Sequence, residues 1–266
     1  MAPLCYDDGM DPLLRTQSGP FSADQIREDD YYELSNGHPI ECSPAGRDHT
    51  GPNLSGAEVL DTDPDVEWAG VDAGFSPEPK TLRAPDVAVG PPAGEGSGWI
   101  PGAPPLAVEY ASVGQEEGKL QERIRDLLAA GTRFVWVVRL VGPRRVEVYE
   151  PGGLVRTLTA GQELRAPGIL RNPVPVEALY DRRAAHEMTL RNLLQRQGYD
   201  DLEAVRAEGE RRGVAQSILA LLASRGLAVG ETLRKRILTC SDSDLLRRWL
   251  VRAASVDEAE ELFAEE

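Results

Sequence analysis

The chain has few cysteines and no long apolar run, and each shortage argues against a class of protein. Its three cysteines, Cys5, Cys42 and Cys240, are widely spaced, which argues against a disulfide framework and favours a reducing cytosol. Cys42 lies between His38 and His49, but these three ligand types do not match a zinc spacing. No run of about 18 apolar residues exists for a membrane span, and the start, MAPLCYDDGMDPLLR, lacks the features of a secretory signal. We therefore expect a cytoplasmic protein.

Basic charge is also scarce. The 266 residues carry 29 basic against 44 acidic side chains, for a formal net charge of −15. Such a surface opposes unguided contact with nucleic acid or an anionic membrane, so any phosphate-binding surface must be local. Lysine is the rarer basic residue, present only as Lys80, Lys119 and Lys235. The 41% hydrophobic content is nevertheless enough for a large packed core.

The hydrophobic pattern divides the chain into three segments. Residues 1–27 are polar without a clear period, and we expect an arm or a short helix there. Residues 28–180 alternate strand and helix patterns, which predicts an α/β domain. Residues 181–266 show helical periodicity, which predicts an all-helical C-terminal extension. Its apolar face favours packing, homo-oligomerisation or binding of a protein partner.

Within the α/β segment, the pattern predicts each element in turn. Asn36-Gly37 between two short runs predicts a β-hairpin. The following stretch, through residue 80, is rich in Asp, Pro and Gly and is expected to be mostly loop. The next segments predict two strands, an amphipathic helix and two further strands, in the order TLRAPDVAV, PLAVEYAS, GQEEGKLQERIRDLLAAG, RFVWVVRL and RRVEVYE.

One of these strands, in PPLAVEYAS, carries an acid at its centre. Strand alternation places Glu109 between Ala107 and Ala111 on one face. Small neighbours leave space beside the carboxylate, which suits a bound ion or a substrate. The preceding strand, RAPDVAV, carries a second acid, Asp86. Two acids on adjacent strands repel each other unless a cation, a proton or a basic side chain joins them.

A divalent metal ion would resolve this repulsion. Mg²⁺ commonly binds one or two carboxylates together with water and substrate phosphate, so Asp86 and Glu109 are candidate ligands of Mg²⁺ or Mn²⁺. Glu33, in YYELSNG, would complete or orient the site. The helix after Glu109 supplies positive charge, with Arg123 at the edge of its apolar stripe and Lys119 one turn earlier, farther towards solvent. Lys119 is the better chemical candidate, because an ammonium releases a proton more readily than a guanidinium.

The segments YYELSNG, APDVAV, LAVEYAS and LLAAGTRFVWVV, in this order, resemble the Uma-two family, a bacterial branch of the PD-(D/E)XK nuclease superfamily. The resemblance covers roughly residues 25–180 and implies a restriction-endonuclease-like mixed sheet with flanking helices that cleaves DNA with a metal ion. It matches Asp86 and Glu109 to the metal-binding acids and Glu33 to an early glutamate. The family's basic residue falls on Arg123, which is not a lysine. Either Lys119 substitutes for it, or Arg123 neutralises the phosphate, or hydrolysis has been lost.

Each of these residues also has a structural interpretation. Glu109 would then be a buried acid paired with an arginine of the helix, and Asp86 a strand-start acid bonded by backbone N–H groups. Lys119 and Arg123 would lie on a solvated face beside nearby acids, and Glu33 would cap the hairpin. The corresponding function is a catalytically silent nuclease fold that binds a partner through its helical extension.

Overall fold

The chain folds into two compact units, which are described separately. A computed structural model of the protein describes residues 19–42, 44–90, 98–113, 116–153 and 155–264. The first unit ends at Arg196 and the second begins at Gln197. Of the expected N-terminal arm, residues 1–18 lie outside the described residues, and Ala23–Gln25 form a short 3-10 helix, η1.

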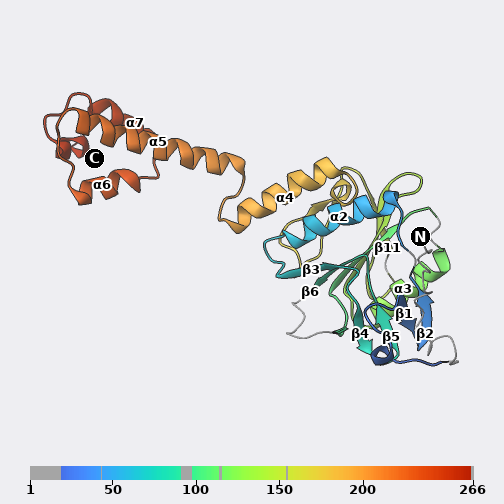
Figure 1. The fold of residues 1–266 in the computed structure, drawn as a ribbon. Coiled ribbons are helices and arrows are strands. Elements are labelled where there is room, and N and C mark those ends of the chain that lie inside the picture. Colours follow the sequence, from blue (N-terminus) through green and yellow to red (C-terminus); the bar gives the residue numbers. More distant parts are fainter. Residues whose placement is uncertain (1–18, 43, 91–97, 114–115, 154, 265–266) are drawn as a thin grey trace, which may run out of the picture. The chain divides into compact units, whose positions relative to one another are not determined.

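The first unit is built on a six-stranded mixed sheet with the strand order β11-β10-β9-β8-β6-β3 (Figure 1). Its central pair, β8 and β9, is parallel, and the other neighbouring pairs are antiparallel. Both central strands are buried on both faces, which explains their nearly continuous apolar runs. The strands are β3 (Trp68–Val71), β6 (Val87–Gly90), β8 (Leu106–Ala111), β9 (Phe134–Arg139), β10 (Arg145–Tyr149) and β11 (Val155–Thr159).

A second, five-stranded sheet has the order β2-β1-β5-β4-β7. The predicted hairpin is confirmed, because β1 and β2 join at Asn36 and Gly37, whose φ angles of 49° and 78° suit the tight turn that this dipeptide favours. The strands are β1 (Tyr32–Ser35), β2 (His38–Glu41), β4 (Phe75–Glu78), β5 (Thr81–Arg83) and β7 (Ile100–Pro101); a separate pair is formed by β12 (Glu163–Leu164) and β13 (Val174–Pro175), followed by the 3-10 helix η2 (Val176–Leu179).

Helices cover both faces of the six-stranded sheet. The predicted amphipathic helix is confirmed as α3 (Glu117–Ala129), which buries Leu120 and Ile124 against the face of β8 that carries the two alanines. On the other face lie α2 (Arg47–Asp61) and α4 (Arg182–Arg196), which run side by side (Figure 1). Glu109 therefore points from β8 towards α3.

The expectation of a mostly loop-like stretch through residue 80 is wrong, since it contains α2, β3 and β4. Helix α2 includes glycines and a proline, and only its last turns carry large buried apolar side chains, Val59 and Leu60. Packing explains the helix better than propensity does. A Cβ added at Gly56 would lie 1.9 Å from the Tyr110 hydroxyl, so the glycine permits the close approach of α2 to β8.

The single strand expected for TLRAPDVAV is instead split between the two sheets. β5 ends at Arg83 and β6 begins at Val87. Pro85 lies in the crossing and has no N–H to donate to a strand ladder, which favours the break. The crossing places Arg83 in one sheet and Asp86 at the start of a strand in the other.

The second unit is helical, as expected for the extension. A small core gathers Ile218, Ile237 and Trp249 from three helices. The elements are α5 (Leu202–Ser224), α6 (Glu231–Leu238), α7 (Ser243–Arg252) and the 3-10 helix η3 (Ala259–Phe263). None of the described helices is long and apolar enough to cross a lipid bilayer.

The boundary between the two units lies directly after α4, at Arg196. Residue 180, where the sequence predicted the boundary, therefore falls inside the first unit. Asn192 of α4 donates from Nδ2 to the carbonyl oxygen of Val59 at 3.0 Å. Arg196 donates to the carbonyl oxygens of Asp61 and Val66 at 2.6 and 2.7 Å. These bonds satisfy carbonyl groups at and just beyond the C-terminal end of α2, and they tie α4 to the rest of the first unit.

Candidate active site

Glu109 is the most deeply buried acid of the candidate site. Its side chain is 1% exposed, and Oε2 accepts a hydrogen bond from Arg123 Nη1 at 2.8 Å. Oε1 has no hydrogen-bond partner among the described residues. Burial raises the pKa of Glu109 to about 8, against the opposing effect of the Arg123 guanidinium. The carboxyl group thus keeps one oxygen available for a proton or a cation.

Asp86 lies beside Glu109 at the start of β6. Val87 pairs with Val108 in the antiparallel register, so the next positions along the two strands bring Asp86 opposite Glu109. Asp86 Oδ2 accepts a hydrogen bond from the Tyr110 backbone N at 2.6 Å, and Oδ1 lies 3.2 Å from His49 Nε2. The hydrogen bond with Asp86 raises the pKa of His49. The two predicted metal ligands are therefore neighbours, and both are held by nearby groups.

Glu33 is held between two arginines. It is 3% exposed on β1; its Oε1 accepts from Arg123 Nη2 at 2.9 Å and its Oε2 from Arg83 Nη1 at 3.0 Å. Arg83 is itself 2% exposed and donates from Nε to Asp126 of α3 at 3.0 Å. Five charged groups therefore alternate in sign, in the order Asp126, Arg83, Glu33, Arg123 and Glu109.

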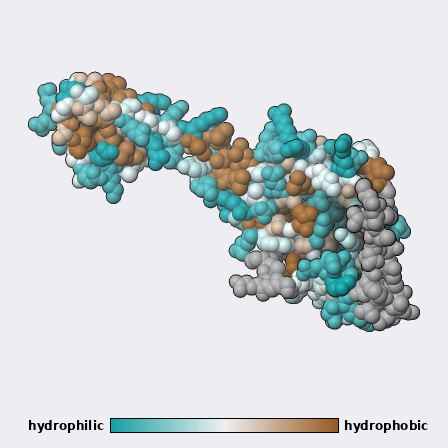
Figure 2. Space-filling view, in the orientation of Figure 1, coloured by the Kyte–Doolittle hydropathy of each residue, from teal (hydrophilic) through white to brown (hydrophobic). Residues whose placement is uncertain are grey.

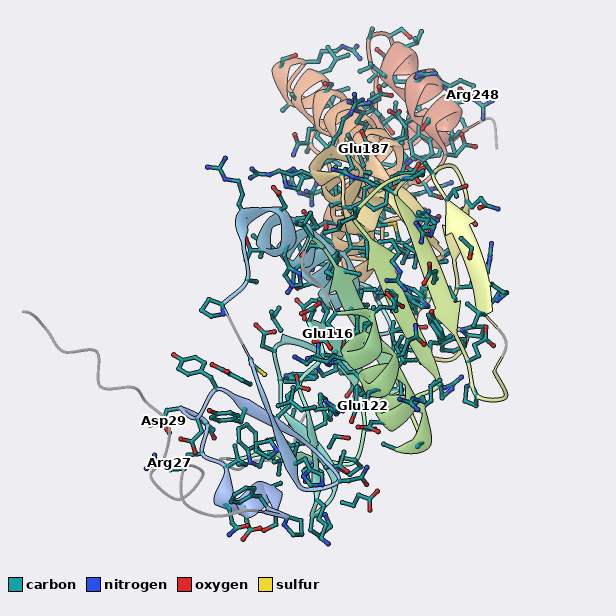
Figure 3. All side chains as sticks on the ribbon, turned by 90° about the vertical axis from the view of Figure 1, so that its right-hand side faces the viewer. Arg27, Asp29, Glu116, Glu122, Glu187 and Arg248 are labelled. Atoms are coloured by element: carbon teal, nitrogen blue, oxygen red, sulfur yellow. The ribbon has the colours of Figure 1, made fainter. Side chains whose placement is uncertain are left out.

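The two basic candidates on α3 differ in position. Arg123 bridges Glu33 and Glu109, and these carboxylates raise its pKa, so the guanidinium stays protonated. Lys119 has a side chain that is 61% exposed and forms an ion pair with Glu116 at 2.9 Å. Glu116 lies at the start of the helix (Figure 3). The structure therefore brings Arg123 together with the predicted acids and leaves Lys119 outside the cluster.

Sequence reasoning missed several partners of these acids. His49 lies on α2, which was expected to be loop, so no pattern placed it opposite Asp86. Arg83 stands three residues before Asp86, but the two were assigned to one strand instead of two sheets. Asp72, in the turn between β3 and β4, adopts a φ of 52°. Its residue surface is exposed, but partial desolvation of the carboxyl group, together with the charge of Asp86, raises its pKa. A prediction of helix α2 would have pointed to His49, and a prediction of the strand break at Pro85 would have separated Arg83 from Asp86.

The arrangement of acids fits a divalent cation of the magnesium type. Within the described residues, no group of three or more His, Cys, Asp or Glu side chains is arranged as a metal site. Mg²⁺ commonly takes only one or two carboxylates and completes its shell with water and substrate oxygens. Glu109, with its unpartnered buried oxygen, and the adjacent Asp86 provide such a pair.

Residues 21–174 match the family model Uma2, described as "Putative restriction endonuclease". The chain belongs to the Uma2 family. The matched segment contains Glu33, Asp86, Glu109 and Arg123, so the whole acid cluster lies within the Uma2 region. The family expected from the sequence is thereby confirmed.

Among solved structures, a similar fold occurs in a protein from Anabaena variabilis described as a "putative nuclease belonging to DUF820". The two share 18% sequence identity with a TM-score of 0.52, over 60% of this chain and 98% of that chain. At this identity the likeness concerns the fold, and it confirms the expected α/β class, a mixed sheet with flanking helices. No curated protein matches the chain.

Proposed function

We propose that this Uma2 protein is a metal-dependent endonuclease that hydrolyses DNA phosphodiester bonds. The observation that carries the proposal is the pair of neighbouring acids in which buried Glu109 keeps an unpartnered oxygen beside Asp86. A purely structural acid at this depth would be expected to have both oxygens hydrogen-bonded. The family to which the chain belongs supports a nuclease-like function.

In this proposal Asp86 and Glu109 hold Mg²⁺ or Mn²⁺. When bound, the ion would lower the pKa of a water molecule and stabilise negative charge on the phosphate. The Tyr110 N–H and His49 orient the Asp86 carboxylate. Well-oriented ligands matter because small displacements of ligating oxygens weaken binding of a metal with strict octahedral geometry.

Arg123 takes the position of the family's basic residue and has a restricted set of roles. One N–H of Nη1 and one of Nη2 are engaged by Glu109 and Glu33, and the remaining N–H groups of the guanidinium could donate to a phosphate oxygen. A guanidinium binds phosphate well but does not accept a proton near neutral pH. Arg123 therefore neutralises the scissile phosphate, with Glu33 assisting by holding it, while activation of water depends on the metal ion.

The decisive test replaces each acid by its isosteric amide. We expect Asp86→Asn and Glu109→Gln each to reduce Mn²⁺-dependent nicking of supercoiled plasmid DNA by about 100-fold or more, and to weaken Mn²⁺ binding measured by calorimetry. Circular dichroism should show that the fold is kept. Glu163→Gln, which changes a half-exposed acid on β12, serves as the matched control and should cut like the wild type.

If both amide variants cut as well as the wild type, the site assignment is wrong. If the wild type binds Mn²⁺ but cuts neither double- nor single-stranded DNA, the DNA substrate is wrong while the metal site stands. These outcomes separate the two parts of the proposal.

A second candidate function is a catalytically silent nuclease fold that acts as a binding module. The ion pair between Arg123 and Glu109 favours it, because a cation already neutralises the acid. Hydrophobic residues also gather over α4 (Figure 2), where Leu190 and Leu193 are 49% and 47% exposed. A wild type that neither binds Mn²⁺ nor cuts DNA, but whose oligomeric state in sedimentation changes with Leu190→Ser, would favour this function.

A further inference from the structure

The alternating chain of charges leaves Glu33 no free oxygen. Each of its carboxylate oxygens accepts a hydrogen bond from a different arginine, at 2.9 and 3.0 Å, within a site from which water is largely excluded. A metal ion that bound Glu33 would share its carboxylate with two guanidinium cations, which repel the ion. Such charge-assisted bonds are among the strongest in proteins, and an arginine left unpaired at this depth is costly.

Asp126, at the other end of this series of charges from Glu109, holds Arg83 in place. Asp126 Oδ2 accepts from Arg83 Nε at 3.0 Å and also from Ser35 Oγ at 2.9 Å. Arg83 is thus fixed between Asp126 and Glu33, and Glu33 in turn fixes Arg123. The last contact in the series is that of Arg123 with Glu109. Residues from β1, β5, β8 and α3 therefore hold one guanidinium in place over one carboxylate.

The charge balance of the cluster points to a single divalent ion. The carboxylates that hydrogen-bond within the cluster are those of Glu33, Asp86, Glu109 and Asp126, against the two guanidiniums of Arg83 and Arg123. When all are ionised, two negative charges remain, which one divalent cation would neutralise. Asp72 is exposed, and Glu122 is 41% exposed at 3.9 Å from Arg83 Nη2, so solvent screens both acids more than the four carboxylates of the cluster.

The oxygens available as metal ligands also indicate one divalent ion. Glu109 Oε1 is a buried acceptor without a partner, and Asp86 lies beside it. A second ion would need further carboxylate ligands. Both oxygens of Glu33 and one oxygen of Glu109 already face an arginine cation, which repels a metal ion. The oxygens of Asp86 instead face a backbone N–H group and His49. Arg123 therefore occupies the place in which a second cation would otherwise balance Glu33 and Glu109.

We propose that Glu33 and Arg83 are positioning residues that hold Arg123 against Glu109, and that the site in consequence takes one divalent cation, bound by Asp86 and Glu109. The proposal rests on the proposed function, since it assigns the number of ions and the supporting residues of the same site. It assigns Arg83, which sequence reasoning missed, a role in catalysis exerted through Arg123.

The test measures metal stoichiometry and turnover separately on the full chain. Calorimetric titration with Mn²⁺ should show one ion per chain for the wild type and for Glu33→Gln, with an unchanged Kd. The kcat for plasmid nicking should fall by about tenfold or more in Glu33→Gln, because the support of Arg123 is lost. Arg83→Lys keeps the positive charge but loses the planar fork, and it should show the same split between Kd and kcat.

Three results would overturn the proposal: two Mn²⁺ ions per wild-type chain, a Kd for Glu33→Gln weakened as strongly as for Glu109→Gln, or an unchanged kcat in both positioning variants. Thermal melting identifies a variant that fails to fold, and Arg83→Lys, the milder change, then decides. Failure of the proposed function looks different, because the wild type would bind no Mn²⁺ and cut no DNA. That result would also overturn the stoichiometry of one.

Discussion

Glu109 is an ionisable residue that is almost completely buried, and burial disfavours its charged form. Desolvation disfavours the carboxylate form more than Arg123 restores it, so its pKa rises to about 8. Near neutral pH the carboxyl group of the metal-free protein therefore takes up a proton more readily than an ordinary glutamate, in competition with its ion pair to Arg123. A bound cation must displace that proton, since metal ligands of this type bind as carboxylates.

This competition predicts a pH-dependent metal affinity. Because the folded-state pKa of Glu109 lies near 8, affinity for Mg²⁺ should rise about tenfold per unit as pH increases from about 6 to about 8, and then level off. Calorimetry in two buffers of different ionisation enthalpy should show close to one proton released per ion below that pKa and fewer above it. An affinity that is flat over this range would contradict the assigned ligand. Glu163→Gln should follow the wild-type curve.

At the scale of elements, α3 decides which basic residue can serve the site. Its apolar stripe faces the sheet through Leu120, Ile124 and Leu127. Arg123 stands beside that stripe in mid-helix and reaches β8, whereas Lys119 stands one turn earlier and pairs with Glu116. The chemical advantage of a lysine is therefore outweighed by its position.

We predict a clear difference between two matched substitutions on α3. Arg123→Met should lower kcat for plasmid nicking by about 100-fold, since the phosphate loses its guanidinium. Lys119→Met removes an exposed ion pair of little energetic value and should leave kcat close to that of the wild type. Steady-state nicking assays in Mn²⁺ measure both. A larger loss in Lys119→Met would identify the lysine as the functional base after all.

At the scale of the whole molecule, each of the two units has its own hydrophobic clusters, three in the first unit and one in the second among the residues that the structure describes. The nuclease-like unit has the sheet core, to which α4 contributes Ala185 and Met188, and the second unit has a core of its own around Trp249. Since each hydrophobic cluster of the described residues is made within one unit, each unit is expected to unfold on its own.

Two truncations test where the nuclease-like unit ends. A chain ending at Arg196 should melt like the first transition of the full chain and keep its cutting activity. A chain ending at Tyr180 loses buried Met188 and the bonds from Asn192 and Arg196 to α2, which should cost about 4 kcal/mol or more. Differential scanning calorimetry measures both. Equal melting temperatures would show that α4 adds nothing to this unit.

Local pattern alone determined much of this protein. Alternation in β8 placed Glu109 between two alanines, the period of α3 placed Arg123 closer to the sheet than Lys119, and Asn36-Gly37 marked a hairpin turn. These features depend on residues close in sequence, whose geometry follows from the strand or helix period. The order of such motifs was also enough to identify the family and the α/β fold.

The tertiary structure alone decided what surrounds the acids. Helix α2 forms because it packs on β8 and α4, and it brings His49 to Asp86. The break at Pro85 sends Arg83 into a second sheet, where it meets Glu33 and Asp126. Burial and long-range charge pairing depend on segments far apart in the chain, so local periodicity carries no information about them. For that reason the sequence predicted the two candidate metal ligands and Arg123, and only the fold revealed Arg83 and the series of ion pairs that fixes Arg123 against Glu109.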